Sequence, residues 1–118
     1  MPKRILIADD EPTVVALARQ KLQSQGYAVE TARNGKEAWD LIMDDSVSFD
    51  MIITDLNMPV MSGEDLCKRV RSSDRLKMIP VIILTSQSDR ATEIRIFRAG
   101  ASDFVVKPFI KEVFIARI

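Results

Sequence analysis

The stretch MIITDLNMPVMSG, Met51 to Gly63, decides the fold because it joins an apolar strand to a polar loop that contains proline. Its first residues, Met51–Thr54, are apolar or β-branched, and Asp55 follows them directly. A short apolar run of this kind is typical of a strand that is covered on both faces, as in a parallel sheet. A carboxylate is costly to bury at the end of such a strand, so Asp55 is a candidate functional residue.

Other parts of the chain have the same strand character, namely Arg4–Ala8, Tyr27–Ala32, Val81–Thr85 and Phe104–Val106. The run at Tyr27–Ala32 mixes polar and apolar residues, so it fits an edge strand. Helical patterns fill the gaps between these runs. They are predicted between Pro12 and Gln25, around Ala38–Ile42, after Ser62, between Ser88 and Gly100, and from Val113 to the last residue, Ile118.

This alternation of strands and helices predicts one doubly wound α/β domain, 1–118, with a five-stranded parallel sheet and helices on both faces. The 118 residues include 17 Lys+Arg and 17 Asp+Glu, so there is no overall basic charge to attract nucleic acid or anionic lipid. Cys67 is the single cysteine, which suits a reducing compartment. No apolar run approaches the length of a membrane span, so a cytoplasmic location is expected. Histidine is absent, which excludes a histidine base or metal ligand within this chain.

The strand ends carry the polar residues that could do chemistry. Acidic residues follow the first and third strands, a hydroxyl pair ends the fourth, and a lysine follows the fifth: Asp9-Asp10-Glu11, Asp55 with Asn57, Thr85-Ser86, and Lys107-Pro108. The carboxyl ends of parallel strands meet at one edge of a sheet, where such folds bind their ligands. We therefore expect these side chains to converge.

Carboxylates that lie close together repel one another, so this edge needs positive charge. Mg²⁺ fits because it prefers oxygen ligands and binds through one or two carboxylates, and Lys107 adds a second positive charge. An aspartate can act as a covalent phosphoryl acceptor, and that reaction depends mainly on positioning and charge neutralisation. The sequence thus predicts Mg²⁺-dependent phosphoryl transfer to Asp55.

The motifs at these strand ends resemble those of the receiver domains of two-component response regulators, and the resemblance covers essentially the whole chain. The matching residues are Asp9-Asp10, Asp55 in ITDLNMPVMSG, Thr85-Ser86 after VIIL, Phe104 in GASDF, and Lys107-Pro108 in KPF. The resemblance implies a flavodoxin-like strand order, 2-1-3-4-5. It also implies a partner that supplies the phosphoryl group, either a sensor histidine kinase or a histidine phosphotransfer protein.

The same resemblance implies a role for each matching residue. Asp55 would accept the phosphoryl group and bind Mg²⁺, together with Asp10 directly, Asp9 through water, and the backbone carbonyl of Asn57. Lys107 would contact the phosphoryl group, and its peptide bond to Pro108 would be cis. Thr85 and Phe104 would form the switch that reshapes the surface of the fourth helix, fifth strand and fifth helix. This surface includes Arg90, Arg95 and Arg98, and it could serve an output partner or a phosphorylation-dependent dimer.

Some positions depart from or vary within the family pattern. Asn57 and Gln87 stand where members vary, and these positions influence the hydrolysis of the phosphoryl group. Phe104 stands where many members have tyrosine. Asp103 and Arg117 match a pair used in one class of dimer, but Glu93 and Val113 do not match that class. The early end of the fifth helix suggests a longer regulator with an output domain, and a short single-domain protein is the alternative.

Other functions remain open at this point. The chain could be an interaction module of the same fold that works without phosphorylation, but such a module has no need for the carboxylate cluster. A phosphohydrolase would want a second carboxylate near Asp55, and position 57 is asparagine. A flavin site would need a phosphate-binding loop where this chain has acidic residues. Taken singly, each acidic residue could also be an ordinary helix cap or turn residue.

Overall fold

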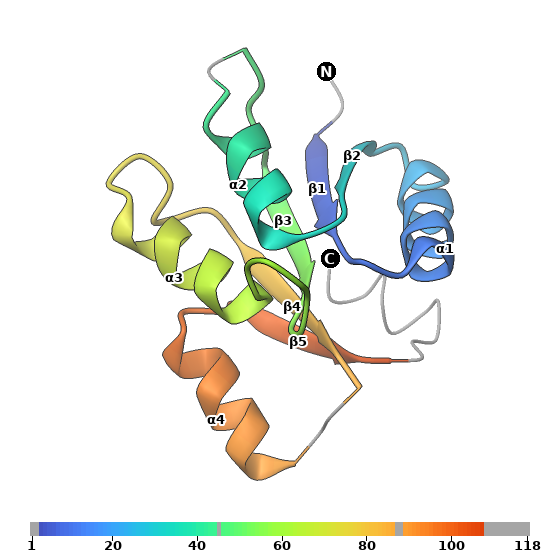
Figure 1. Cartoon of the computed structure of the whole chain (residues 1–118). Coiled ribbons are helices and arrows are strands. Elements are labelled where there is room, and N and C mark those ends of the chain that lie inside the picture. The colour runs from blue at the N-terminus through green and yellow to red at the C-terminus, as the bar shows by residue number, and fades with distance from the viewer. Residues whose placement is uncertain (1–2, 45, 87–88, 108–118) are drawn as a thin grey trace.

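The computed structural model describes residues 3–44, 46–86 and 89–107. Its core is a five-stranded sheet in which every pairing is parallel and the strand order is β2-β1-β3-β4-β5 (Figure 1). The strands are β1 Arg4–Ala8, β2 Ala28–Ala32, β3 Met51–Asp55, β4 Val81–Thr85 and β5 Asp103–Val106. The predicted fold class and strand order are confirmed, and β2 is an edge strand as expected.

Helices alternate with these strands along the chain. The described helices are α1 Pro12–Gln23, α2 Gly35–Ile42, α3 Gly63–Ser72 and α4 Arg90–Arg98. The N-cap of α3 is Ser62, as predicted, and its side chain accepts a hydrogen bond from the backbone N–H of Asp65 at 3.1 Å. The N-cap of α4 is Asp89, whose carboxylate accepts the backbone N–H of Thr92 at 2.9 Å.

Several predicted features fall outside the described residues. They are Gln87, Ser88, the cis peptide bond at Pro108, and the fifth helix with Val113, Arg117 and Ile118.

The two faces of the sheet are covered by different helices, because side chains alternate between the faces along each strand. Leu6 and Ile52 belong to the cluster that includes residues of α2, α3 and α4. Ile5 and Ile53 belong to a second cluster, to which α1 contributes Ala18 and Leu22. Figure 1 shows α1 on one side of the sheet and α2, α3 and α4 on the other. This alternation places Thr54 and Asp55 on opposite faces at the end of β3.

Candidate functional site

The carboxyl ends of β1, β3 and β5 bring three charged side chains together. Asp9 follows β1, Asp55 ends β3, and Lys107 follows β5. The backbone N–H of Lys107 donates to the carbonyl of Thr85 at 2.7 Å, which ties this residue to the end of β4. The predicted convergence of the strand ends on one edge of the sheet is therefore seen in the structure.

The ammonium group of Lys107 lies among three carboxylates. Its Nζ is 3.0 Å from Asp9 Oδ2, 3.1 Å from Asp55 Oδ1 and 3.3 Å from Glu11 Oε1. Asp9 is 1% exposed and Asp55 is 7% exposed, whereas Glu11 is exposed to solvent. One lysine thus faces two buried carboxylates, so the buried part of the site has a deficit of positive charge.

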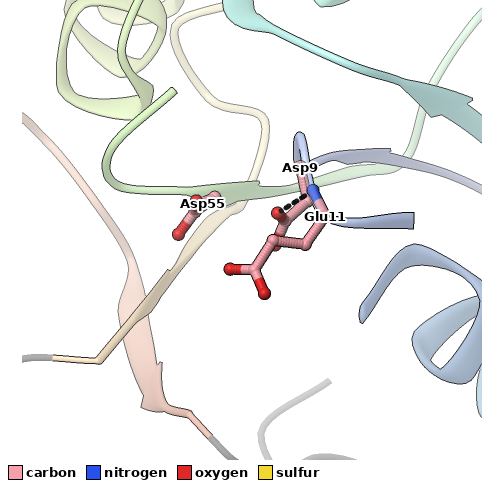
Figure 2. A group of neighbouring side chains, drawn as sticks. All are labelled: Asp9, Glu11 and Asp55. Atoms are coloured by element: carbon pink, nitrogen blue, oxygen red, sulfur yellow. Dashed lines mark hydrogen bonds between the residues drawn. The ribbon is translucent and has the colours of Figure 1, made fainter. Parts of the chain in front are cut away.

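Asp9 is held by the turn that follows β1. Its Oδ1 accepts a hydrogen bond from the backbone N–H of Glu11 at 3.0 Å, drawn as the dashed line in Figure 2. Its Oδ2 is buried and accepts no hydrogen bond from any group in the described ranges, although Lys107 lies beside it as an ion pair. A buried carboxylate oxygen normally has hydrogen-bond partners, so this atom is suited to a further positive ligand.

The pKa of Asp55 also reflects the deficit of positive charge in the buried part of the site. Burial raises the pKa of the Asp55 carboxyl to about 6, and the nearby charge of Asp9 adds to the rise, while Lys107 opposes it. For Lys107, burial alone would lower the pKa, but the adjacent carboxylates of Asp9 and Asp55 outweigh it and leave the pKa raised. Lys107 is therefore firmly protonated, and Asp55 is held in its ionised form less well than an ordinary aspartate.

The acidic residues could hold a metal ion. One carboxylate oxygen from each of Asp9, Glu11 and Asp55 lies within 4.8 Å of the others, and Figure 2 shows the three side chains gathered at the ends of β1 and β3. Oxygen-only donors suit a hard cation such as Mg²⁺. Asp9 Oδ2 has Lys107 beside it but no hydrogen bond within the described ranges, and the pKa of Asp55 is raised, so both observations indicate that a cation would stabilise the site.

The acidic group differs in one member from the predicted metal ligands. The resemblance implies Asp10 as a direct ligand; Asp10 is exposed, and the group of three closely spaced carboxylates does not include it. Glu11 does belong to this group, although its only predicted feature was its place in the acidic run after the first strand. The run of three acidic residues was the available signal, and the structure is needed to tell which of them faces Asp55.

The other predicted residues lie around this cluster. Thr85 is 1% exposed at the end of β4, and Asn57 is exposed in the loop after β3. Phe104 is partly buried on β5, and its ring packs edge-on against Phe97 of α4, with ring centroids 5.8 Å apart. Thr85 thus ends the strand next to β3, and the contact of Phe104 with Phe97 connects β5 to α4.

The surface of α4 combines exposed apolar and basic side chains. Ile94 is 44% exposed and Phe97 is 48% exposed, so this helix has an apolar surface open to solvent. Among its arginines, Arg95 has a partner within the domain, because its Nε lies 2.7 Å from Oε1 of Glu64 on α3. None of the helices in the described ranges is both long and apolar enough to cross a membrane.

The chain matches the response regulator receiver domain family over residues 5–118. It is 39% identical to the chemotaxis protein CheY1 of Helicobacter pylori over 93% of this chain and 89% of that protein. It is 36% identical to the response regulator MprA of Mycolicibacterium vanbaalenii over 100% of this chain but only 49% of that longer protein. A response regulator from Chloroflexus aurantiacus has a solved structure that superposes with a TM-score of 0.93, at 37% identity, over 99% of this chain and 94% of that one. The chain therefore belongs to the response regulator receiver domains.

Proposed function

We propose that Asp55 accepts a phosphoryl group from a phosphohistidine of a partner protein in a Mg²⁺-dependent reaction, and that this modification changes the surface formed by α4, β5 and the segment that follows. The observation that carries the proposal is the position of Lys107, whose ammonium group contacts the buried carboxylates of Asp9 and Asp55 at 3.0 and 3.1 Å. A structural domain gains nothing from two buried carboxylates that share one cation, whereas a phosphoryl acceptor needs this arrangement.

In the proposed reaction, a carboxylate oxygen of Asp55 attacks phosphorus. The new P–O bond forms as the P–N bond to the donor imidazole breaks, and the imidazole leaves with that electron pair and takes up a proton. Lys107 lies 3.1 Å from Asp55 Oδ1, so it is within reach of an oxygen of a group attached to this carboxylate. The buried hydroxyl of Thr85 would donate a hydrogen bond to another phosphoryl oxygen.

The metal would be held by Asp9, Asp10 and Asp55 and by the backbone carbonyl of Asn57, and we propose that Asp9 acts through water. When bound, Mg²⁺ would supply positive charge to offset the carboxylates and the phosphoryl oxygens. The buried Asp9 Oδ2, which has no hydrogen bond within the described ranges beside its ion pair with Lys107, supports this assignment. The same groups would let the domain promote both its own phosphorylation and the hydrolysis of the acyl phosphate by water.

The signal would pass from Thr85 to Phe104. Movement of Thr85 toward the phosphoryl group would leave space on the inner side of β5, and the aromatic ring of Phe104 would turn to fill it. The contact of Phe104 with Phe97 supports this route, because it connects β5 to α4. The charge added at Asp55 would thereby shift the balance between two arrangements of the α4 and β5 surface.

The proposed partners follow from this chemistry. They are a sensor histidine kinase or a histidine phosphotransfer protein, and an output partner or a second copy that contacts the α4 and β5 surface. We propose a cytoplasmic location, with no contact of this domain with nucleic acid or membrane. Residues 1–118 would form a single receiver domain.

The test is to incubate the protein with a small acyl-phosphate donor, with and without Mg²⁺, and to measure its intact mass. A single phosphoryl adduct that requires both Mg²⁺ and Asp55 is expected, and Asp55→Asn is the control. Rapid hydrolysis is checked by the binding of a non-hydrolysable phosphoryl mimic. Failure of both assays would contradict the proposal and favour an interaction module that works without phosphorylation.

A further inference from the structure

Thr54 is a fully buried polar residue in an otherwise apolar strand. It precedes Asp55 on β3 and is 0% exposed on the face of the sheet that it shares with Ile52. Its hydroxyl donates a hydrogen bond to the backbone carbonyl of Asp55 at 3.1 Å. The same hydroxyl lies 4.0 Å from the sulfur of Met58, in the loop that leaves the site. The Thr54 hydroxyl therefore contacts the main chain of Asp55 and the turn that follows it.

The other end of this turn packs against the same place. A Cβ atom at Gly63, the first residue of α3, would lie 2.0 Å from the carbonyl oxygen of Asp55 and 3.1 Å from Thr54 Oγ1. The backbone N–H of Gly63 donates to the carbonyl of Leu56 at 3.0 Å. The start of α3 thus rests directly on the Asp55 carbonyl and the Thr54 hydroxyl, with no room for a larger group between them.

The turn itself has an unfavourable backbone conformation. Val60 has a φ of 70°, which a β-branched residue rarely adopts, and its side chain is 80% exposed. Such a conformation persists only where the surrounding structure holds it. One such restraint is the backbone N–H of Gly35, which donates to the carbonyl of Met61 at 3.0 Å. At the Asp55 end of the turn, the backbone N–H of Leu56 donates to the carbonyl of Leu84 at 2.9 Å, and the Thr54 hydroxyl adds a side-chain contact to the Asp55 carbonyl.

We propose that Thr54 is a positioning residue for the acceptor, whose hydroxyl fixes the main chain of Asp55 and the turn after it. This inference rests on the proposed function. Replacing the hydroxyl by a methyl group would remove the donor to the Asp55 carbonyl and would introduce a larger group where Gly63 packs. The carboxylate of Asp55 and the carbonyl of Asn57 would then shift together. Because small displacements of reacting groups slow catalysis steeply, the effect should be large for a residue that does not touch the phosphoryl group.

The experiment compares Thr54→Val and Thr54→Ala, which both lack the hydroxyl, with Thr54→Ser, which keeps it. Ile52→Val is the matched control, because it removes one buried methylene from the same face of the same strand and leaves the Thr54 hydroxyl in place. The rate of adduct formation with acetyl phosphate and Mg²⁺ is measured by intact mass. The affinity for Mg²⁺ alone is measured by amide chemical shifts, and the melting temperature is measured for every variant.

Both variants without the hydroxyl should form the adduct about tenfold more slowly and bind Mg²⁺ about tenfold more weakly. Thr54→Ser and Ile52→Val should stay within about twofold of the wild type in both assays, even where their melting temperatures fall. The inference is overturned if Thr54→Ser is as impaired as Thr54→Val, or if both hydroxyl-free variants match Ile52→Val.

The wild type separates this inference from the proposed function. A wild type that binds Mg²⁺ but forms no adduct would contradict the proposed function, and the Mg²⁺ affinities of the variants would still decide the role of Thr54. A wild type that neither binds Mg²⁺ nor forms the adduct would overturn both.

Discussion

Replacing Asp55 by asparagine should stabilise the metal-free protein at neutral pH. In the folded protein the pKa of the Asp55 carboxyl is raised from 3.8 to about 6, mainly by burial and then by the charge of Asp9. The folded state therefore holds this proton more tightly than the unfolded state. The stability contributed by the protonated group is full below about pH 4 and is lost as the pH rises through about 6.

The size of the effect follows from the same pKa. A tenfold change in a proton equilibrium is worth about 1.4 kcal/mol, so a rise from 3.8 to about 6 corresponds to about 3 kcal/mol. The attraction of Lys107 for the carboxylate is already included, since it opposes the rise. Asparagine resembles the neutral acid, so Asp55→Asn should raise the free energy of unfolding by about 2–3 kcal/mol at about pH 7.5 and by little near pH 4.

The assay is urea unfolding of both proteins in the presence of a chelator, at about pH 7.5 and about pH 4.5. Asp40→Asn is the control, because Asp40 is an exposed carboxylate on α2 that pairs with Lys36 at the surface. That change should alter the free energy of unfolding by less than about 0.5 kcal/mol at either pH. Added Mg²⁺ should narrow the gap between wild type and Asp55→Asn, since a ligand of the native state stabilises it.

Two results would refute this reasoning. One is a variant that is no more stable than the wild type at neutral pH. The other is a gain in the free energy of unfolding that is equal at both pH values, because a gain without pH dependence cannot come from an ionised carboxylate.

Further predictions concern other positions in the fold. Val60→Asn should raise the free energy of unfolding, measured in urea, by about 1 kcal/mol, because asparagine tolerates the φ of 70° better and the valine side chain is 80% exposed. A lower free energy of unfolding in this variant would contradict backbone strain at Val60. Lys107→Met should lower the free energy of unfolding by about 3 kcal/mol at neutral pH, because two buried carboxylates lose their cation. This loss should shrink at low pH, and an equal loss at both pH values would argue against charge as the cause. Arg71→Met should lower the free energy of unfolding by about 3 kcal/mol in the same assay, because the Arg71 guanidinium donates to the carbonyl of Gly100 at 2.7 Å and to three further acceptors; full recovery in Arg71→Lys would contradict a role for the planar group.

The fold could be predicted from the sequence because three of its strands are almost continuously apolar. Three apolar runs could only be covered strands, and the helical patterns between them imposed parallel connections. The exact ends of the elements are harder to predict, because neighbouring residues can serve equally well as caps. Ser88 and Asp89 are both good N-cap residues, and the hydrogen bond from the N–H of Thr92 selects Asp89.

The site was predictable to the extent that topology determines it. Asp9, Asp55 and Lys107 follow parallel strands, so the sheet brings them together whatever the loops do. Asp10 and Glu11 lie in a turn, where the backbone decides which side chain faces Asp55, and a sequence does not specify that orientation. The role inferred for Thr54 was also beyond the sequence, because it depends on how closely Gly63 approaches the Asp55 carbonyl.

The central claim is that Asp55, and not a neighbouring carboxylate, carries the phosphoryl group. The most direct measurement is to phosphorylate the wild type with acetyl phosphate and Mg²⁺, reduce the acyl phosphate with borohydride, and locate the modified residue by peptide mass spectrometry. Reduction converts a phosphorylated aspartate to homoserine, so the account predicts homoserine at position 55 and unmodified residues at positions 9, 10 and 11. Homoserine at position 9 or 10, a reduced side chain at position 11, or no modified peptide in a sample that carries the adduct would contradict it.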